Sequence, residues 1–155
     1  MRSVGVCVHL PRRGRPAARV VVGVGAWNAA SEEETFELTS NKDDTATVLH
    51  ELASGLRSHL SGLSADRVVI RRADRQRVAS NADGPRVRLL AEGALAAAAR
   101  SEVTDVVVLP GKDLADRTPA QSKDDLDAEA ARQLPSAPVE AAAAALAGLH
   151  TGLSP

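Results

Sequence analysis

The chain is poor in aromatic residues and in cysteine. Its 155 residues contain no tyrosine, one tryptophan (Trp27) and one phenylalanine (Phe36), so the core is expected to consist of valine, leucine and alanine. The single cysteine, Cys7, excludes an intrachain disulfide and favours a reducing compartment. No run of about 18 apolar residues suggests a membrane span, and the apolar start ends too early, at Pro11, for a signal peptide. We therefore expect a cytoplasmic protein.

Lysine is also scarce, with three residues among the 19 basic ones. A preference for arginine combined with abundant alanine is typical of a bacterium with a GC-rich genome. The net charge of -1 provides no overall field that would attract nucleic acid or a membrane surface. The length fits a single domain, residues 1–155, and no internal repeat is visible.

Three β-strand patterns occupy the first third of the chain. The ranges 3–10, 19–27 and 34–39 are rich in valine or alternate between apolar and polar residues. A turn-like segment, 11–16, separates the first two. Because the links between these strands are short, we expect a three-stranded antiparallel meander.

The spacing of apolar residues then becomes helical. One apolar stripe predicts a helix over 44–63, with Asp43 or Asp44 as its cap. A strand at 67–72 follows, and Pro85 fits the first turn of a second helix that runs to about residue 100. The expected inward residues of the second helix are Val87, Leu90, Ala91, Ala94, Leu95 and Ala98.

The last third continues the alternation of strands and helices. A strand over 104–109 stops at Pro110-Gly111, and an alanine-rich helix is expected over 136–150. Between them lies a polar connecting segment, 112–134, that is either mobile or folded into short helices. Because strands separated by helices pair in parallel, the fold class is α/β. We predict a mixed sheet in which the antiparallel meander is followed by β-α-β-α-β-α, with helices packed on the sheet.

Four short segments accompany this order of elements: Gly5-Val6-Cys7-Val8, Glu37-Leu38-Thr39-Ser40-Asn41-Lys42, Val68-Val69-Ile70-Arg71-Arg72 and Pro138-Val139-Glu140-Ala141-Ala142. With them, the chain resembles the ribonuclease H-like superfamily and its RuvC-like branch in particular. The stretch 36–112 is similar to an uncharacterised bacterial family, domain of unknown function 3010. The resemblance covers most of the chain.

The resemblance implies a metal-dependent nuclease site, which the residues here do not reproduce. Active members of the superfamily hold two Mg²⁺ ions about 4 Å apart with carboxylates from the first strand, the fourth strand and the last helix. The matching positions here are Cys7, Arg71 and Glu140. A thiol is a poor Mg²⁺ ligand and an arginine is a permanent cation, so we expect a degenerate site with no catalytic residue, metal or cofactor. Asp74, just behind the fourth strand, is the one acidic residue that could swing inward.

Other signals favour ordinary structural roles. Cys7 lies in a valine-rich strand and is expected in the core, although the sequence does not exclude a partner that is close only in space. No two of the four histidines have the spacing of zinc ligands. The pair Gly23 and Gly25 after a strand lacks both the third glycine and the helix of a dinucleotide-binding motif.

Two arginine clusters suggest a basic rim. The clusters are Arg12, Arg13 and Arg15 in the first turn, and Arg71, Arg72, Arg75 and Arg77 at and beyond the end of the fourth strand. The second cluster would border the degenerate site and could contact phosphates, but near-zero net charge and few aromatic residues for base stacking favour a solvated loop.

Three functions therefore stay open. The favoured one is a non-catalytic binding or assembly module, a homo-oligomer or a partner of another protein, with the alanine-rich helix either packed on the sheet or offered to a second copy. The second is a nucleic-acid-binding pseudonuclease that uses Arg71 to Arg77. The third is a divergent nuclease with Glu140 and Asp74 in a rearranged metal site.

Overall fold

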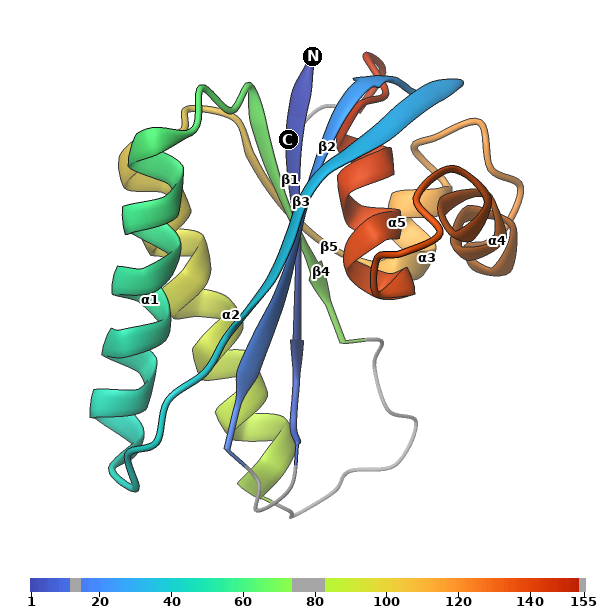
Figure 1. The fold of residues 1–155 in the computed structure, drawn as a ribbon. Helices are drawn as coiled ribbons and strands as arrows, with labels where there is room; N and C mark the ends of the chain where they lie inside the picture. Colours follow the sequence, from blue (N-terminus) through green and yellow to red (C-terminus); the bar gives the residue numbers. More distant parts are fainter. Residues whose placement is uncertain (12–14, 74–82, 154–155) are drawn as a thin grey trace.

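The computed structural model describes residues 1–11, 15–73 and 83–153, and within them a five-stranded sheet carries helices on both faces (Figure 1). The strands are β1 (Arg2–His9), β2 (Ala17–Ala26), β3 (Ala29–Leu38), β4 (Arg67–Arg72) and β5 (Val106–Pro110). The helices are α1 (Thr45–Gly62), α2 (Asp83–Glu102), α3 (Gly111–Ala115), α4 (Lys123–Gln133) and α5 (Val139–Gly148).

The sheet is mixed, as the sequence predicts. Its strand order is β3-β2-β1-β4-β5, with antiparallel pairing within the meander and parallel pairing of β4 to β1 and β5. The third strand begins at Ala29, five residues before the predicted start at Glu34, because it pairs with β2 along its whole length. Its first residues, Ala-Ala-Ser, lack the alternation by which a strand is recognised in sequence.

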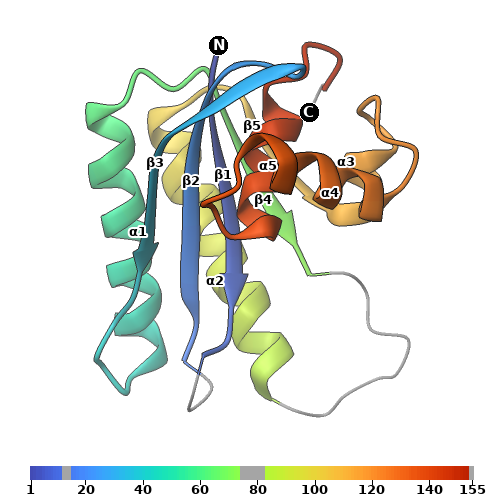
Figure 2. The same ribbon diagram turned by 45° about the vertical axis from the view of Figure 1, so that its right-hand side comes forward.

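The two faces of the sheet are covered by different helices. Figures 1 and 2 show α1 and α2 on one face and α3, α4 and α5 on the other. The residues of the central strand β1 alternate between the two faces. Val4, Val6 and Val8 belong to the core beneath α1 and α2, whereas Cys7 belongs to the core beneath α3, α4 and α5. This alternation follows from the two-residue period of a strand.

Helix α5 lies unusually close to β1, and Gly5 makes this possible. A Cβ atom at Gly5 would lie 2.1 Å from the carbonyl oxygen of Ala141 and 2.2 Å from the amide nitrogen of Ala145. All residues from Ala141 to Gly148 are buried. The alanine-rich helix therefore packs on the sheet, and its small residues are not available to a second copy of the chain.

Helix α1 matches its prediction closely. The Asp44 side chain caps it by accepting a hydrogen bond from the Thr47 amide at 2.8 Å. The buried stripe consists of Val48, Leu52, Leu56 and Leu60. Here regular leucine spacing and an acidic cap were sufficient to identify both the helix and its inward face.

Helix α2 is present, and its predicted inward face is correct only in part. Ala91 and Leu95 are buried as predicted, but Glu92 and Ala99 are buried with them, while Leu90 is 55% exposed. Alanine contributes little to a hydrophobic pattern, so the sequence oriented this helix poorly. A glutamate occupies an inward position because it has specific partners there.

The segment 112–134 contains most of α3 and all of α4. It contributes Leu114, Leu126, Ala130 and Leu134 to the core beneath α5. Ser122 caps α4 by accepting from the Asp125 amide at 3.1 Å. In the described part of the chain, no helix is long and apolar enough to cross a membrane.

Candidate functional site

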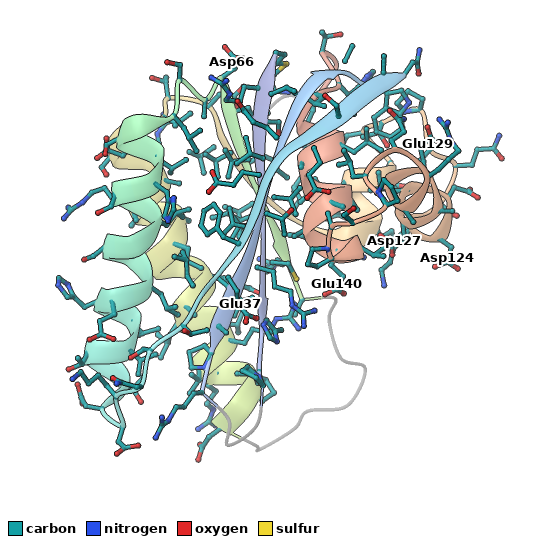
Figure 3. All side chains as sticks on the ribbon, viewed as in Figure 1. Glu37, Asp66, Asp124, Asp127, Glu129 and Glu140 are labelled. Atoms are coloured by element: carbon teal, nitrogen blue, oxygen red, sulfur yellow. The ribbon has the colours of Figure 1, made fainter. Side chains whose placement is uncertain are left out.

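The site lies at the carboxyl ends of β1 and β4. These strands are parallel neighbours, and their register places Cys7 beside Arg71. The first turn of α5 brings Glu140 to the same place, and Figure 3 shows Glu140 and Asp127 of α4 on the same side of the sheet. The three residues matched from the sequence are thus brought together, and a fourth joins them.

Cys7 and Glu140 are directly bonded. The Cys7 thiol donates to Glu140 Oε2 at 3.0 Å, across 133 residues of sequence. Burial and the neighbouring carboxylate raise the pKa of Cys7 to about 12. The group is therefore a protonated thiol at neutral pH, which suits neither a nucleophile nor a metal ligand.

Arg71 pairs with Asp127, not with Glu140. Its side chain is 2% exposed, and its guanidinium holds the Asp127 carboxylate with two hydrogen bonds, Nη1 to Oδ1 and Nη2 to Oδ2, the second at 3.2 Å. Glu140 acts on Arg71 only electrostatically, and the carboxylate that binds it belongs to α4. The correct partner lies in the segment 112–134, whose helices the sequence left undefined.

Gly111 provides the space for this guanidinium. A Cβ atom at Gly111 would lie 2.8 Å from both Nε and Nη2 of Arg71. The guanidinium therefore fits only because Gly111 has no side chain, and the turn that ends β5 is part of the site.

A second arginine enters from the opposite face of the sheet. Arg88 Nη2 lies 3.9 Å from Cys7 Sγ, and its Nε donates to Glu92 Oε1 at 3.1 Å. The same Glu92 oxygen accepts from the Ala73 amide at 3.0 Å, which fixes the chain just after β4. Glu92 is 2% exposed, and its Oε2 has no partner among the described residues. The sequence pattern did not predict this pair, because the buried face of the helix was assigned from its apolar residues alone.

The positive charges keep Glu140 ionised. Burial acts to raise its pKa, but the Cys7 hydrogen bond and the charges of Arg71, Arg88 and Lys123 outweigh burial and lower it. The site is thus a compact set of alternating charges: arginines face carboxylates, and a neutral thiol lies between them.

A small hollow of ≈ 210 Å³ opens beside Glu140 and is lined by Cys7, His9 and Arg19, among others. Glu37 closes its edge from β3, because His9 Nε2 lies 2.5 Å and Arg19 Nε 3.6 Å from Glu37 Oε1. Charges of both signs are therefore balanced around the hollow as well.

The basic rim can be placed only in part. Arg72 ends β4 and is partly buried. Asp74, Arg75 and Arg77, and Arg12 and Arg13 in the first turn, lie outside the described residues.

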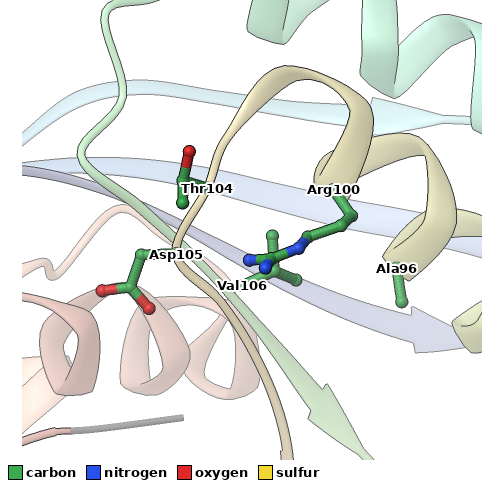
Figure 4. Close-up of a pocket in the computed structure, with 5 residues that line it drawn as sticks. All are labelled: Ala96, Arg100, Thr104, Asp105 and Val106. Carbon is green, nitrogen blue, oxygen red and sulfur yellow. The ribbon is translucent and has the colours of Figure 1, made fainter.

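A second hollow lies at the opposite ends of β4 and β5 (Figure 4). Its lining includes Arg100 and Asp105, but the Asp105 carboxylate points away from Arg100. Asp105 instead pairs with Arg67, at 2.6 Å from Nη2. The ion pair between Arg67 and Asp105 thus joins β4 to the residue before β5.

Comparison with solved structures identifies the architecture. A structure of Thermus thermophilus RuvC superposes with a TM-score of 0.68 at 16% identity, over 95% of this chain and 92% of that one. T. thermophilus RuvC in complex with a Holliday junction substrate gives a TM-score of 0.68 at 15% identity, over 95% and 91%. No protein-family model and no curated protein sequence matches the chain.

The chain has a RuvC-like, ribonuclease H-like fold. The likeness is in fold, and membership in domain of unknown function 3010 stays a prediction. The mixed sheet and the packing of helices on both its faces agree with the predicted fold class.

The residues of the RuvC-like site do not fit a pair of divalent cations. Arg71 and Arg88 place two positive charges among the oxygen atoms that would have to serve as ligands, and Cys7 presents a protonated thiol. Mg²⁺ requires oxygen ligands in octahedral geometry and is repelled by neighbouring cations. In the described residues, no group of three or more potential ligands is arranged to hold a metal ion.

Proposed function

We propose that this RuvC-like domain is a pseudonuclease that binds nucleic acid without cutting it. The observation that carries the proposal is the reversal of charge at one edge of the sheet. Where active members of the superfamily collect carboxylates, this chain has the buried Arg71 and the neighbouring Arg88. Because these two arginines are already paired with Asp127 and Glu92, they disfavour a metal pair, and the phosphate contacts fall to the arginines of the connections that leave this edge.

The connections that leave this edge strengthen the reversal. The stretch 10–16, which links β1 to β2, contains three arginines and no acidic residue. The stretch 71–82, from the end of β4 to the start of α2, contains four arginines and one acidic residue, Asp74. In a chain with a net charge of -1, positive charge is thus concentrated in two segments that start where Cys7 and Arg71 meet. Arginine in such density is typical of contacts with a phosphate backbone.

The structural relatives suggest the probe. One of the two RuvC structures contains a Holliday junction substrate, so a four-way DNA junction is the natural first ligand, with linear duplex of equal length for comparison.

A role in protein assembly is the second candidate. It is favoured by Leu89 and Leu90, which project from α2 and are each 55% exposed. Adjacent exposed leucines are more typical of a protein contact than of a phosphate-binding surface.

Fluorescence anisotropy with a labelled four-way junction tests the proposed function. We expect binding at low salt that weakens by about tenfold or more between 50 and 200 mM salt, as release of counterions requires. Replacing Arg75 and Arg77 together by glutamate should weaken binding at least about tenfold, because the phosphate contacts are lost and like charges are introduced. The charge-matched control replaces Arg57 of α1 and Arg100 of α2, both exposed and outside the two arginine-rich segments. It should change affinity less than about twofold.

Three results would overturn the proposal. They are no binding at low salt, binding that is insensitive to salt, and equal effects of the two double variants. Cleavage of the junction in Mg²⁺ or Mn²⁺ that is lost in Glu140→Ala would instead establish a divergent nuclease.

A further inference from the structure

The burial and close pairing of Arg71 are not explained by the proposed function. Its side chain is 2% exposed, two of its nitrogens bind Asp127, and Gly111 leaves the space that its guanidinium fills. A buried charge is costly unless it is paired and hydrogen-bonded, so this arrangement is maintained against a large desolvation penalty.

The surroundings of Arg71 have the chemistry of a cation site. The carboxylates of Asp127 and Glu140 both act electrostatically on Arg71, as does Cys7. These groups come from three elements far apart in sequence, α4, α5 and β1. The other arginine, Arg88, forms its ion pair with Glu92 and acts electrostatically on Glu140. Arg71 is the cation that binds Asp127 directly and also acts electrostatically on Glu140.

We propose that the Arg71 guanidinium permanently takes the place of a divalent cation in this site. Its positive charge compensates the carboxylates of Asp127 and Glu140, which such an ion would otherwise bridge. The site is consequently closed to divalent cations in the natural chain and becomes open to them when Arg71 is removed. This inference goes beyond the proposed function, because it holds whether or not the domain binds nucleic acid.

The test compares the natural chain with Arg71→Met, which keeps an apolar stem of similar length and removes the charge. The probe is Mn²⁺, which prefers carboxylate and water ligands, and binding is followed by the loss of the free-ion signal in electron paramagnetic resonance. We expect Arg71→Met to bind one Mn²⁺ at least about tenfold more tightly than the natural chain. We also expect saturating Mn²⁺ to raise its melting temperature by about 4 °C or more, while changing that of the natural chain by less than about 1 °C.

Arg67→Met is the matched control. Arg67 lies on the same strand and, like Arg71, is buried and paired with one carboxylate, Asp105. Among the described residues, its other hydrogen bonds go to the carbonyl oxygens of Gly148 and His150, so Asp105 is the only carboxylate bonded to it. Arg67→Met is expected to be destabilised without any gain in Mn²⁺ affinity.

Adding Asp127→Asn to Arg71→Met should abolish the gained affinity, since one of the two carboxylates is then neutral. The proposal is overturned if Arg71→Met binds Mn²⁺ no better than the natural chain, or if Arg67→Met gains as much. It is also overturned if Arg71→Met fails to fold both with and without Mn²⁺. Folding of Arg71→Met only in the presence of Mn²⁺ supports it.

Discussion

The Cys7 thiol donates a hydrogen bond to Glu140 at the point where β1 meets the first turn of α5. This contact joins the central strand to the helix that covers it, and it places a neutral donor beside the Glu140 carboxylate. Several measurable properties of the domain depend on it.

Thiol reactivity is the most direct of these. Because burial and Glu140 raise the pKa of Cys7 to about 12, almost none of it is thiolate at pH 8. We expect labelling by a thiol reagent at least about a hundredfold slower in the native protein than in denaturant. Labelling at comparable rates would show that the thiol is neither buried nor bonded as described.

The same contact predicts how stability depends on alkaline pH. The thiol has an ordinary pKa of 9.0, and in the folded protein this rises to about 12. The stabilisation is fully present below pH 9, and it is lost between about pH 9 and 12 because the unfolded chain releases its proton first. In chemical denaturation, unfolding free energy should fall with pH in this range more steeply than for Cys7→Ala, by up to about 1.4 kcal/mol per pH unit. Parallel curves for the two proteins would contradict the assignment.

Glu140 predicts the opposite dependence at acidic pH. Its pKa in the folded protein is lowered from the ordinary value of 4.5, so its contribution is present above that pH and is lost as the pH falls below it. Glu140→Gln should therefore lose less stability than the natural chain between pH 5 and about pH 3. Identical acid transitions would mean that Glu140 is not held as a carboxylate.

Two glycine substitutions test the close packing of α5 on β1. Gly5→Ala places a methyl group against the Ala141 carbonyl and should cost about 3–5 kcal/mol or prevent folding. Gly93→Ala is the control, because nothing lies within 4 Å of the added atom and the residue lies in the exposed part of α2. It should stabilise the protein by about 0.5–1 kcal/mol, and equal effects of the two changes would contradict the described packing.

Two ion pairs of α4 should differ sharply in their contribution to the free energy of unfolding. Asp127→Ala leaves the buried Arg71 without its bidentate partner, and we expect a loss of about 2–3 kcal/mol, somewhat reduced because Asp127 is 23% exposed. Arg132→Ala on the same helix removes an exposed pair with Glu129 and should change stability much less, because solvent screens that pair. The two losses, measured by urea denaturation, should be clearly separated.

The fold was predictable because its signals are local. Valine-rich runs, the leucine stripe of α1 and the acidic cap at Asp44 each identify an element without reference to the rest of the chain. The proximity of Cys7 and Arg71 was also predictable, because parallel pairing brings their strands together once the order of elements is known.

The partners within the site could not be predicted in this way. Asp127 reaches Arg71 only because α3 and α4 fold beneath α5, and nothing in the polar segment 112–134 indicates their direction. Glu92 was unexpected because an acidic residue on a buried helix face is normally evidence against burial. The pairing of Arg71 with Asp127 joins residues far apart in the chain, which sequence spacing does not encode, whereas Arg88 and Glu92 have helical i,i+4 spacing and only the burial of Glu92 was unexpected.

The close approach of α5 to β1 has a consequence for synthesis. Strand β1 lies at the centre of the sheet, but the helix that covers its Cys7 face comes more than 130 residues later in the chain. Until residues 139–148 have been made, the Cys7 face of the sheet lacks the helix that covers it in the folded domain. The nascent chain is therefore expected to rely on chaperones for that interval, and its maturation should be limited by the arrival of a single short helix.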